Sequence, residues 1–165
     1  MERHPETGRE ETESERLDRN LGELLGELRV ALPGVQVLFA FLLVVPFNQR
    51  FASVSSFDKT VYFVTLLCTL AASLFLIAPS VHHRISFRLQ DKEHIVLVAN
   101  RLAIVGLSFL AVAMTGVILL VTDFLFGTGT TVATTTLVAA AFALLWYAIP
   151  LRRRQAGERR DRPAR

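Results

Sequence analysis

An unbroken run without ionisable side chains, residues 102–122 (LAIVGLSFLAVAMTGVILLVT), restricts the fold more than any other feature of the chain. Arg101 precedes the run and Asp123 follows it. At about 1.5 Å rise per residue, a helix of this length covers roughly 30 Å, the thickness of the hydrocarbon layer of a bilayer. A helix also satisfies its own backbone hydrogen bonds in lipid. The run therefore predicts a membrane-spanning helix.

Three further stretches, at about residues 30–47, 60–78 and 130–150, have the same apolar character. The chain has 165 residues, is 52% hydrophobic and has a mean hydropathy of +0.41, yet its charges gather at the two ends and in one central loop. A soluble domain distributes its charges over all helix faces instead. We therefore predict an all-α membrane protein with four transmembrane helices in an antiparallel bundle, which occupies residues 13–151.

The N-terminal arm has two parts. We expect residues 1–12 to be disordered, because they are polar and contain no apolar run. Residues 13–29 form an amphipathic cytoplasmic helix in this interpretation, and Thr12 with Glu15 has the spacing of a capping box. Its apolar stripe is made by four leucines, Leu17, Leu21, Leu24 and Leu28.

The stripe could serve in two ways. It could lie on the membrane surface or against the inner ends of the other helices, or it could form a short coiled coil that makes a dimer. Either use makes these leucines candidate partner-binding residues. Pro33 lacks the amide that would bond back to Arg29, so we expect the helix to break or bend where it enters the membrane.

Small residues predict how the spans pack. Close approach of small-residue faces is the main driving force for helix association in lipid. The small residues on one helical face of the third span are Ala99, Ala103, Gly106 and Ala113. The candidates for such a face on the fourth span are Ala133, Ala140 and Ala143.

The basic residues predict the orientation. Fifteen of the eighteen Lys and Arg lie in the N-terminal arm, the central loop at residues 80–94 and the C-terminal tail. Because basic loops stay on the cytoplasmic side, we expect a multi-pass protein with both termini cytoplasmic. The tail, residues 152–165, should be disordered and drawn to anionic lipid headgroups by its arginines, at about 1 kcal/mol for each arginine near the surface.

The residue types present argue against catalysis. Cys68 is the only cysteine, so neither a disulfide nor a cysteine-based metal site can form within the chain. His82, His83 and His94 lack the spacing of a zinc site. No span contains a carboxylate that could couple transport to protons, nor a histidine that could hold haem. We expect no enzyme activity, no catalytic residue, no cofactor, no metal and no nucleic-acid partner.

Four polar residues in or near the spans are candidate functional residues, namely Gln36, Asn100, Arg101 and Asp123. Gln36 sits about one turn inside the first span, where a glutamine commonly bonds a neighbouring helix. Arg101 lies at the inner interface, where its long side chain can reach the headgroups. Arg101 and Asp123 are roughly 33 Å apart along one helix, so they mark opposite ends and cannot pair.

The sequence resembles a known family. The stretch GELRVALPGVQVLFAFLLVVPF (residues 26–47) carries most of the likeness, together with short later motifs: Arg50-Phe51, Val61-Tyr62, Ala78-Pro79, His83-Arg84, Phe87-Arg88, Asn100-Arg101-Leu102, Trp146-Tyr147 and Pro150. Over residues 16–151 the chain is similar to an uncharacterised family of bacterial four-helix membrane proteins, the 6328 domain-of-unknown-function family. The resemblance implies four spans in a bacterial plasma membrane and implies no activity.

Two functions fit these features. The first is a non-enzymatic membrane protein that binds a partner or organises a complex, with the lipid bilayer and either another membrane protein or a second copy as its partners. The alternative is an oligomeric pore or transporter subunit with a path near Arg101. The first is favoured because the charged features lie outside the spans.

Overall fold

The fold is all-helical over the residues that the computed structural model describes, 12–85, 92–149 and 151–152. Its elements are α1 (Glu13–Val44), α2 (Ser56–Ile85), α3 (Lys92–Leu125) and α4 (Thr128–Phe142), which continues as a π-helical turn, η3 (Ala143–Ala148). Two short 3₁₀ turns, η1 (Val45–Phe47) and η2 (Gln49–Ser53), connect α1 to α2. The prediction of four helices is confirmed, and all four are long and apolar enough to cross a membrane.

The helix α1 joins the amphipathic segment and the first apolar stretch into one element. It begins with the predicted capping box, in which the Glu15 carboxylate accepts from the Thr12 N–H at 2.9 Å and the Thr12 hydroxyl accepts from the Glu15 N–H at 3.3 Å. Of the break or bend expected at Pro33, the break is absent, because α1 continues through Pro33 without interruption. Leu28 and Val35, on either side of Pro33, are buried in the same core cluster, and this packing holds the helix together across the missing backbone bond.

The leucine stripe packs inside the chain. Leu21 lies in a cluster with Ile95 and Ala99 of α3, while Leu28 lies in the main core with α2 and α3. Leu21 and Leu28 are buried, and Leu17 and Leu24 are half-buried. Of the two uses predicted for the stripe, the structure shows packing against the other helices, so the faces of Leu21 and Leu28 are not available to a partner.

Helices α2 and α3 form the most extensive contact in the fold, and small residues allow it. The predicted face of α3 is confirmed, since Ala99, Ala103, Gly106 and Ala113 are all buried. A Cβ at Gly106 would lie 2.8 Å from Cγ of Leu76, a side chain with no exposed surface, so α2 can approach this closely only because position 106 is glycine.

Hydroxyl groups in these two helices bond their own preceding turns, as their helical context predicts. Thr69 Oγ1 donates to the Thr65 carbonyl at 2.8 Å, Thr115 Oγ1 to the Ala111 carbonyl at 2.8 Å, and Ser73 Oγ to the Thr69 carbonyl at 3.1 Å. These bonds occupy the hydroxyl protons, and the groups need no further partner.

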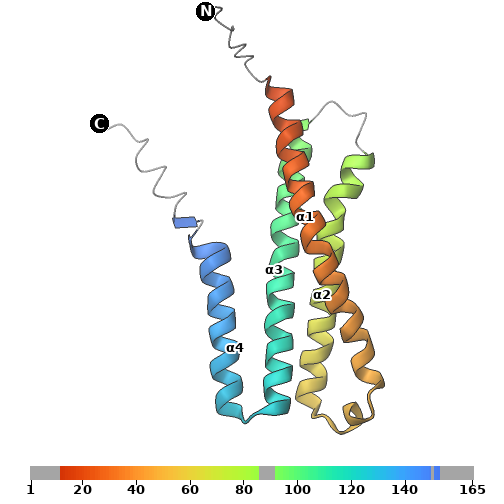
Figure 1. Cartoon of the computed structure of the whole chain (residues 1–165), viewed down its shortest axis with the longest axis vertical. Coiled ribbons are helices and arrows are strands. Elements are labelled where there is room, and N and C mark those ends of the chain that lie inside the picture. Colours follow the sequence, from red (N-terminus) through yellow and green to blue (C-terminus); the bar gives the residue numbers. More distant parts are fainter. Residues whose placement is uncertain (1–11, 86–91, 150, 153–165) are drawn as a thin grey trace, which may run out of the picture.

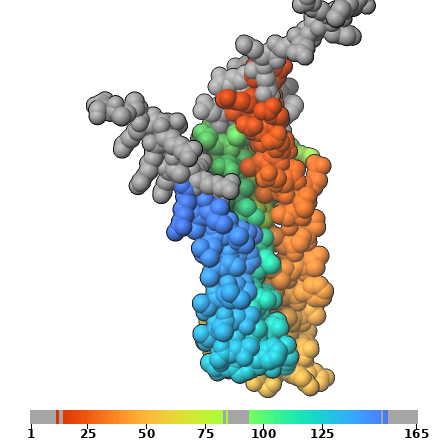
Figure 2. Space-filling view, turned by 60° about the vertical axis from the view of Figure 1, so that its left-hand side comes forward, coloured from red at the N-terminus to blue at the C-terminus, as the bar shows by residue number. Residues whose placement is uncertain are grey.

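Helix α4 stands apart from the other three. It packs closely only with α3, so the core consists of α1, α2 and α3, and α4 lies along the side of α3 (Figures 1 and 2). The prediction for its small residues is wrong: Ala133, Ala140 and Ala143 are all exposed. Among its residues only Thr131 is buried. The connection between α1 and α2 and the one between α3 and α4 lie at the same end of the molecule (Figure 1).

Several predictions concern residues outside those described. They include the disorder expected for residues 1–11 and 153–165, the lipid contact of the arginines beyond residue 152, and the part of the basic central loop at residues 86–91. His82 is half-buried near the end of α2 and His94 is exposed near the start of α3.

Candidate functional site

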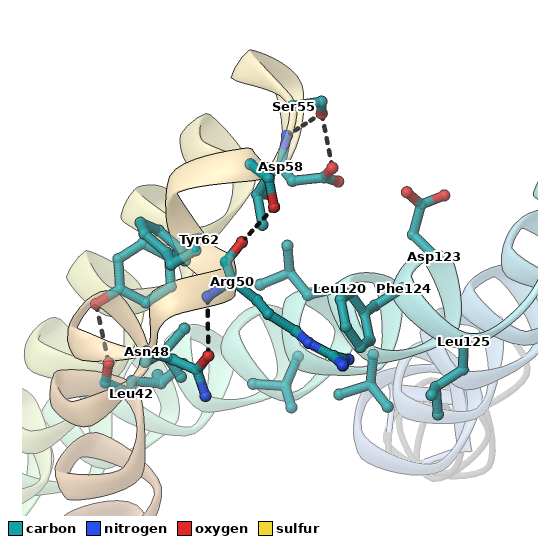
Figure 3. Close-up of a pocket in the computed structure, with 16 residues that line it drawn as sticks. Leu42, Asn48, Arg50, Ser55, Asp58, Tyr62, Leu120, Asp123, Phe124 and Leu125 are labelled. Carbon is teal, nitrogen blue, oxygen red and sulfur yellow. Dashed lines mark hydrogen bonds between the residues drawn. The ribbon is translucent and has the colours of Figure 1, made fainter.

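A pocket that contains charged side chains lies at the end of the helices where α1 turns into α2. It has a volume of about 920 Å³ and opens between this connection and the C-terminal end of α3 (Figure 3). We call it the end pocket. Its walls are largely apolar, and its ionisable side chains come from three different elements: Arg50 of η2, Asp58 of α2 and Asp123 of α3.

Local hydrogen bonds fix the backbone of Arg50. The Asn48 side chain accepts a bond of 3.0 Å from the Arg50 N–H, and the Ser53 hydroxyl donates one of 2.8 Å to the Arg50 carbonyl. The side chain of Arg50 then extends across the pocket toward Leu120 and Phe124 of α3 (Figure 3). No described residue forms an ion pair or hydrogen bond with its guanidinium, which leaves that cation free to meet a ligand.

The start of α2 holds Asp58 in a defined position. The Ser55 hydroxyl accepts a bond of 3.1 Å from the Asp58 N–H and donates one of 2.6 Å to Oδ2 of the same residue. This arrangement caps the first turn of α2 and places the negative charge at the positive end of the helix dipole. The other carboxylate oxygen, Oδ1, is buried and has no hydrogen-bond partner among the described residues.

Tyr62 forms the inner wall of the pocket. It is buried, and its hydroxyl donates a hydrogen bond of 2.9 Å to the carbonyl oxygen of Leu42 (Figure 3). Its ring meets that of Phe51 edge to face, with 5.1 Å between the ring centres. The ring pair and the hydrogen bond attach the connection to both α1 and α2, so the pocket has a fixed shape on this side.

The four predicted polar residues are not brought together. Gln36, Asn100, Arg101 and Asp123 are all exposed, and they lie at different levels of α1 and α3. Only Asp123 lines the end pocket. A path near Arg101 stays a prediction, because it would need further copies of the chain to enclose it.

Sequence reasoning did not identify Arg50, Asp58 and Tyr62 as members of one site. In the sequence, Arg50 and Tyr62 stand out only within two short motifs, Arg50-Phe51 and Val61-Tyr62. A usable signal was present: two opposite charges and several aromatic residues lie within a connection that joins two apolar helices. Their shared pocket depends on α3, which is remote in sequence.

A second hollow runs between α2 and α4, with α3 as its floor, and we call it the α2–α4 groove. Its volume is about 590 Å³ and its lining is almost wholly apolar. The small residues that line it are Ala111 and Gly116 of α3, Ala139 of α4 and Ala143 of η3. The groove exists because α4 packs closely with α3 and not with α2.

At one end of this groove a hydroxyl pair joins η3 to α3. Ser108 Oγ and the Tyr147 hydroxyl oxygen are 2.6 Å apart, and Ser108 Oγ also donates to the Ile104 carbonyl at 2.7 Å. Because the serine has a single hydroxyl proton, Tyr147 must be the donor to Ser108. The π-helical turn brings Tyr147 into this position, and such turns are frequent at functional sites.

The described residues hold no group of three or more His, Cys, Asp or Glu side chains that could bind a metal ion. A search of curated proteins and a search of solved structures found no match to the chain. Comparison with protein families gives one match, over residues 10–150, which covers all four helices of the structure. The chain therefore belongs to the family of unknown function DUF6328.

Proposed function

We propose that the protein is a non-enzymatic, multi-pass membrane protein that binds a transmembrane helix of another membrane protein and so organises a complex. The observation that carries this proposal is the open α2–α4 groove. A chain that served only as a compact bundle would bury α4 against two neighbours, as helix bundles do. Here α4 packs closely with α3 alone.

The chemistry of the groove suits a helix as its occupant. Without a hydrophobic driving force between helices in lipid, association depends on close packing, which small residues permit. Ala111 and Gly116 supply such a surface on the floor of the groove, and Ala139 and Ala143 supply it on the side formed by α4 and η3. The leucine stripe takes no part in this proposal, because Leu21 and Leu28 are buried within the chain.

The cellular setting is part of the same proposal. Four helices are long and apolar enough to cross a membrane, and we place them in a bacterial plasma membrane in an antiparallel arrangement. The distribution of Lys and Arg supports cytoplasmic termini, with the amphipathic start of α1 on the cytoplasmic side. The end pocket then faces the opposite side of the membrane.

Filling the groove tests the proposal. Ala139→Leu and Ala143→Leu place large side chains in the groove, whereas Ala141→Leu adds the same side chain at an exposed position of α4 that does not line it. Each tagged protein is purified from native membranes in mild detergent. We expect the unmodified chain and Ala141→Leu to retain the same second membrane protein, and the two groove variants to lose it.

Two results would reject the proposal. One is recovery of the unmodified chain alone or only with further copies of itself. The other is equal retention of the second protein by all variants, which would place its contact outside the groove. Circular dichroism of each variant shows whether the helices are intact.

A further inference from the structure

The end pocket contains an exposed cation that lies beside apolar side chains. Arg50 extends between apolar side chains such as Leu120 and Phe124, and no described residue pairs with its guanidinium (Figure 3). An exposed guanidinium without a partner among the described residues has its N–H donors available to an anion from outside the chain. The pocket is therefore suited to an anionic group that Arg50 can bind through paired hydrogen bonds, as guanidinium binds phosphate.

Two carboxylates line the same pocket and point to a second, cationic group. Oδ1 of Asp58 is buried and accepts no hydrogen bond among the described residues. Asp123 lines the pocket from the end of α3. Oδ1 of Asp58 is closed to a ligand, but Asp123 is exposed, so its carboxylate can accept hydrogen bonds from a ligand that brings N–H donors.

The position of the pocket indicates that a lipid supplies the anionic and the cationic group. It lies where the apolar helices α1 and α3 end, at the level where lipid headgroups meet protein. Leu42, Leu120 and Phe124 in its walls continue into the apolar surfaces of α1 and α3, along which acyl chains can lie. Its volume of about 920 Å³ is within the range of roughly 300–1,000 Å³ of ligand pockets.

We propose that the end pocket binds the headgroup of a phospholipid that carries both a phosphate and a primary ammonium, as phosphatidylethanolamine does. The phosphate pairs with Arg50, and the ammonium donates to the carboxylate of Asp123, while Asp58 adds a second negative charge to the same pocket. This site is separate from the α2–α4 groove and does not depend on the function proposed for the groove.

The charge balance separates this lipid from the other common headgroups. One arginine and two carboxylates leave the pocket with one negative charge in excess, which disfavours an anionic headgroup such as phosphatidylglycerol. Phosphatidylcholine matches the charges but has no N–H donor for the carboxylate of Asp123. Of these three lipids, only phosphatidylethanolamine supplies both a phosphate for Arg50 and an N–H donor for Asp123.

Lipid binding to the purified, delipidated chain tests the proposal. The chain in detergent is mixed with phosphatidylethanolamine, phosphatidylcholine or phosphatidylglycerol of the same acyl chains, and bound lipid is counted by native mass spectrometry. We expect phosphatidylethanolamine to bind about tenfold more tightly than the other two, the equivalent of one charge-assisted hydrogen bond. Soluble glycerophosphoethanolamine should bind far more weakly, because it has no acyl chains.

Three variants make the test specific. Arg50→Gln should weaken binding of phosphatidylethanolamine about tenfold. Asp123→Asn should reduce its preference over phosphatidylcholine without abolishing binding. Lys59→Gln is the matched control, because Lys59 belongs to the same end of the molecule but donates to the Ala52 carbonyl at 3.3 Å and does not line the pocket. It should bind as the unmodified chain does.

Equal binding of the three lipids would overturn the proposal, as would equal loss in Arg50→Gln and Lys59→Gln. Binding of soluble glycerophosphoethanolamine as tight as that of the lipid would overturn the assignment to a membrane lipid. Loss of the lipid by Ala139→Leu or Ala143→Leu is not expected, so the outcome at the end pocket can be distinguished from the outcome at the groove.

Discussion

The hydroxyl of Tyr62 donates a hydrogen bond of 2.9 Å to the carbonyl oxygen of Leu42 and so joins the first turns of α2 to the last turn of α1. The same carbonyl accepts the N–H of Val45, which caps α1. The end of a helix leaves carbonyl groups without partners in the helix, and here a remote side chain supplies a donor. This bond holds together the two helices that flank the end pocket.

Replacing Tyr62 by Phe should lower the free energy of unfolding by about 1 kcal/mol, because it removes one buried hydrogen bond and little apolar surface. Reversible unfolding of the purified chain in mixed micelles measures the change. Phe63→Leu is a suitable control, since Phe63 is an exposed neighbour of Tyr62. An equal loss of stability in both variants would contradict the role given to the bond.

Gly106→Ala should destabilise the chain by about 1–2 kcal/mol, which is the usual cost of overpacking less the gain from a better helix former. The new Cβ would lie 2.8 Å from Leu76 Cγ and Cδ2 and 3.2 Å from the Leu76 backbone nitrogen. Leu76 is fully buried, so its side chain has no free space into which to move. The same unfolding measurement applies.

Gly26→Ala provides the opposite case. A Cβ at Gly26 meets nothing within 4 Å, so the substitution should be neutral or should stabilise α1 by about 0.5–1 kcal/mol. If Gly106→Ala proved as harmless as Gly26→Ala, α2 and α3 would not be in close contact at Gly106.

Leu28→Ala should lower the free energy of unfolding by about 2–4 kcal/mol, as for a leucine removed from a packed core. Leu28 is only 4% exposed and packs with residues of both α2 and α3. Leu43→Ala on the same helix, where the leucine is 46% exposed, should change the free energy by less than about 0.5 kcal/mol. A small effect at Leu28 would indicate that the leucine stripe faces a partner instead.

Local and periodic features of the fold could be predicted from the sequence. The capping box at Thr12 needs only two residues at a fixed spacing, and both of its bonds are present. The buried face of α3 follows from small residues that repeat at helical spacing, and Ala99 and Gly106 are buried as expected. Such features depend on the helix itself and on the general rule that small residues mark close contacts in lipid.

The sequence did not predict which face of α4 meets another helix, nor which segments meet at the end pocket. Helix α4 has threonines and apolar residues on all its sides, so its sequence gives no indication of which face meets another helix, and the alanines chosen for contact are exposed. The end pocket depends on how η2 turns between two helices and on the end of α3. No spacing in the sequence relates Arg50 to Asp123, which the fold places around the same cavity.

The pair formed by Ser108 and Tyr147 should couple η3 to α3, and a double-mutant cycle can measure this coupling. Tyr147→Phe removes the donor, and Ser108→Ala removes the acceptor at 2.6 Å, together with the serine's own bond to Ile104. We expect a coupling energy of about 0.5–1.5 kcal/mol, the range found for side-chain hydrogen bonds between helices in membranes. Because α3 and η3 make no close backbone approach, this bond is a principal attachment there. Additive effects of the two substitutions, with a coupling energy near zero, would mean that η3 keeps its position without the bond.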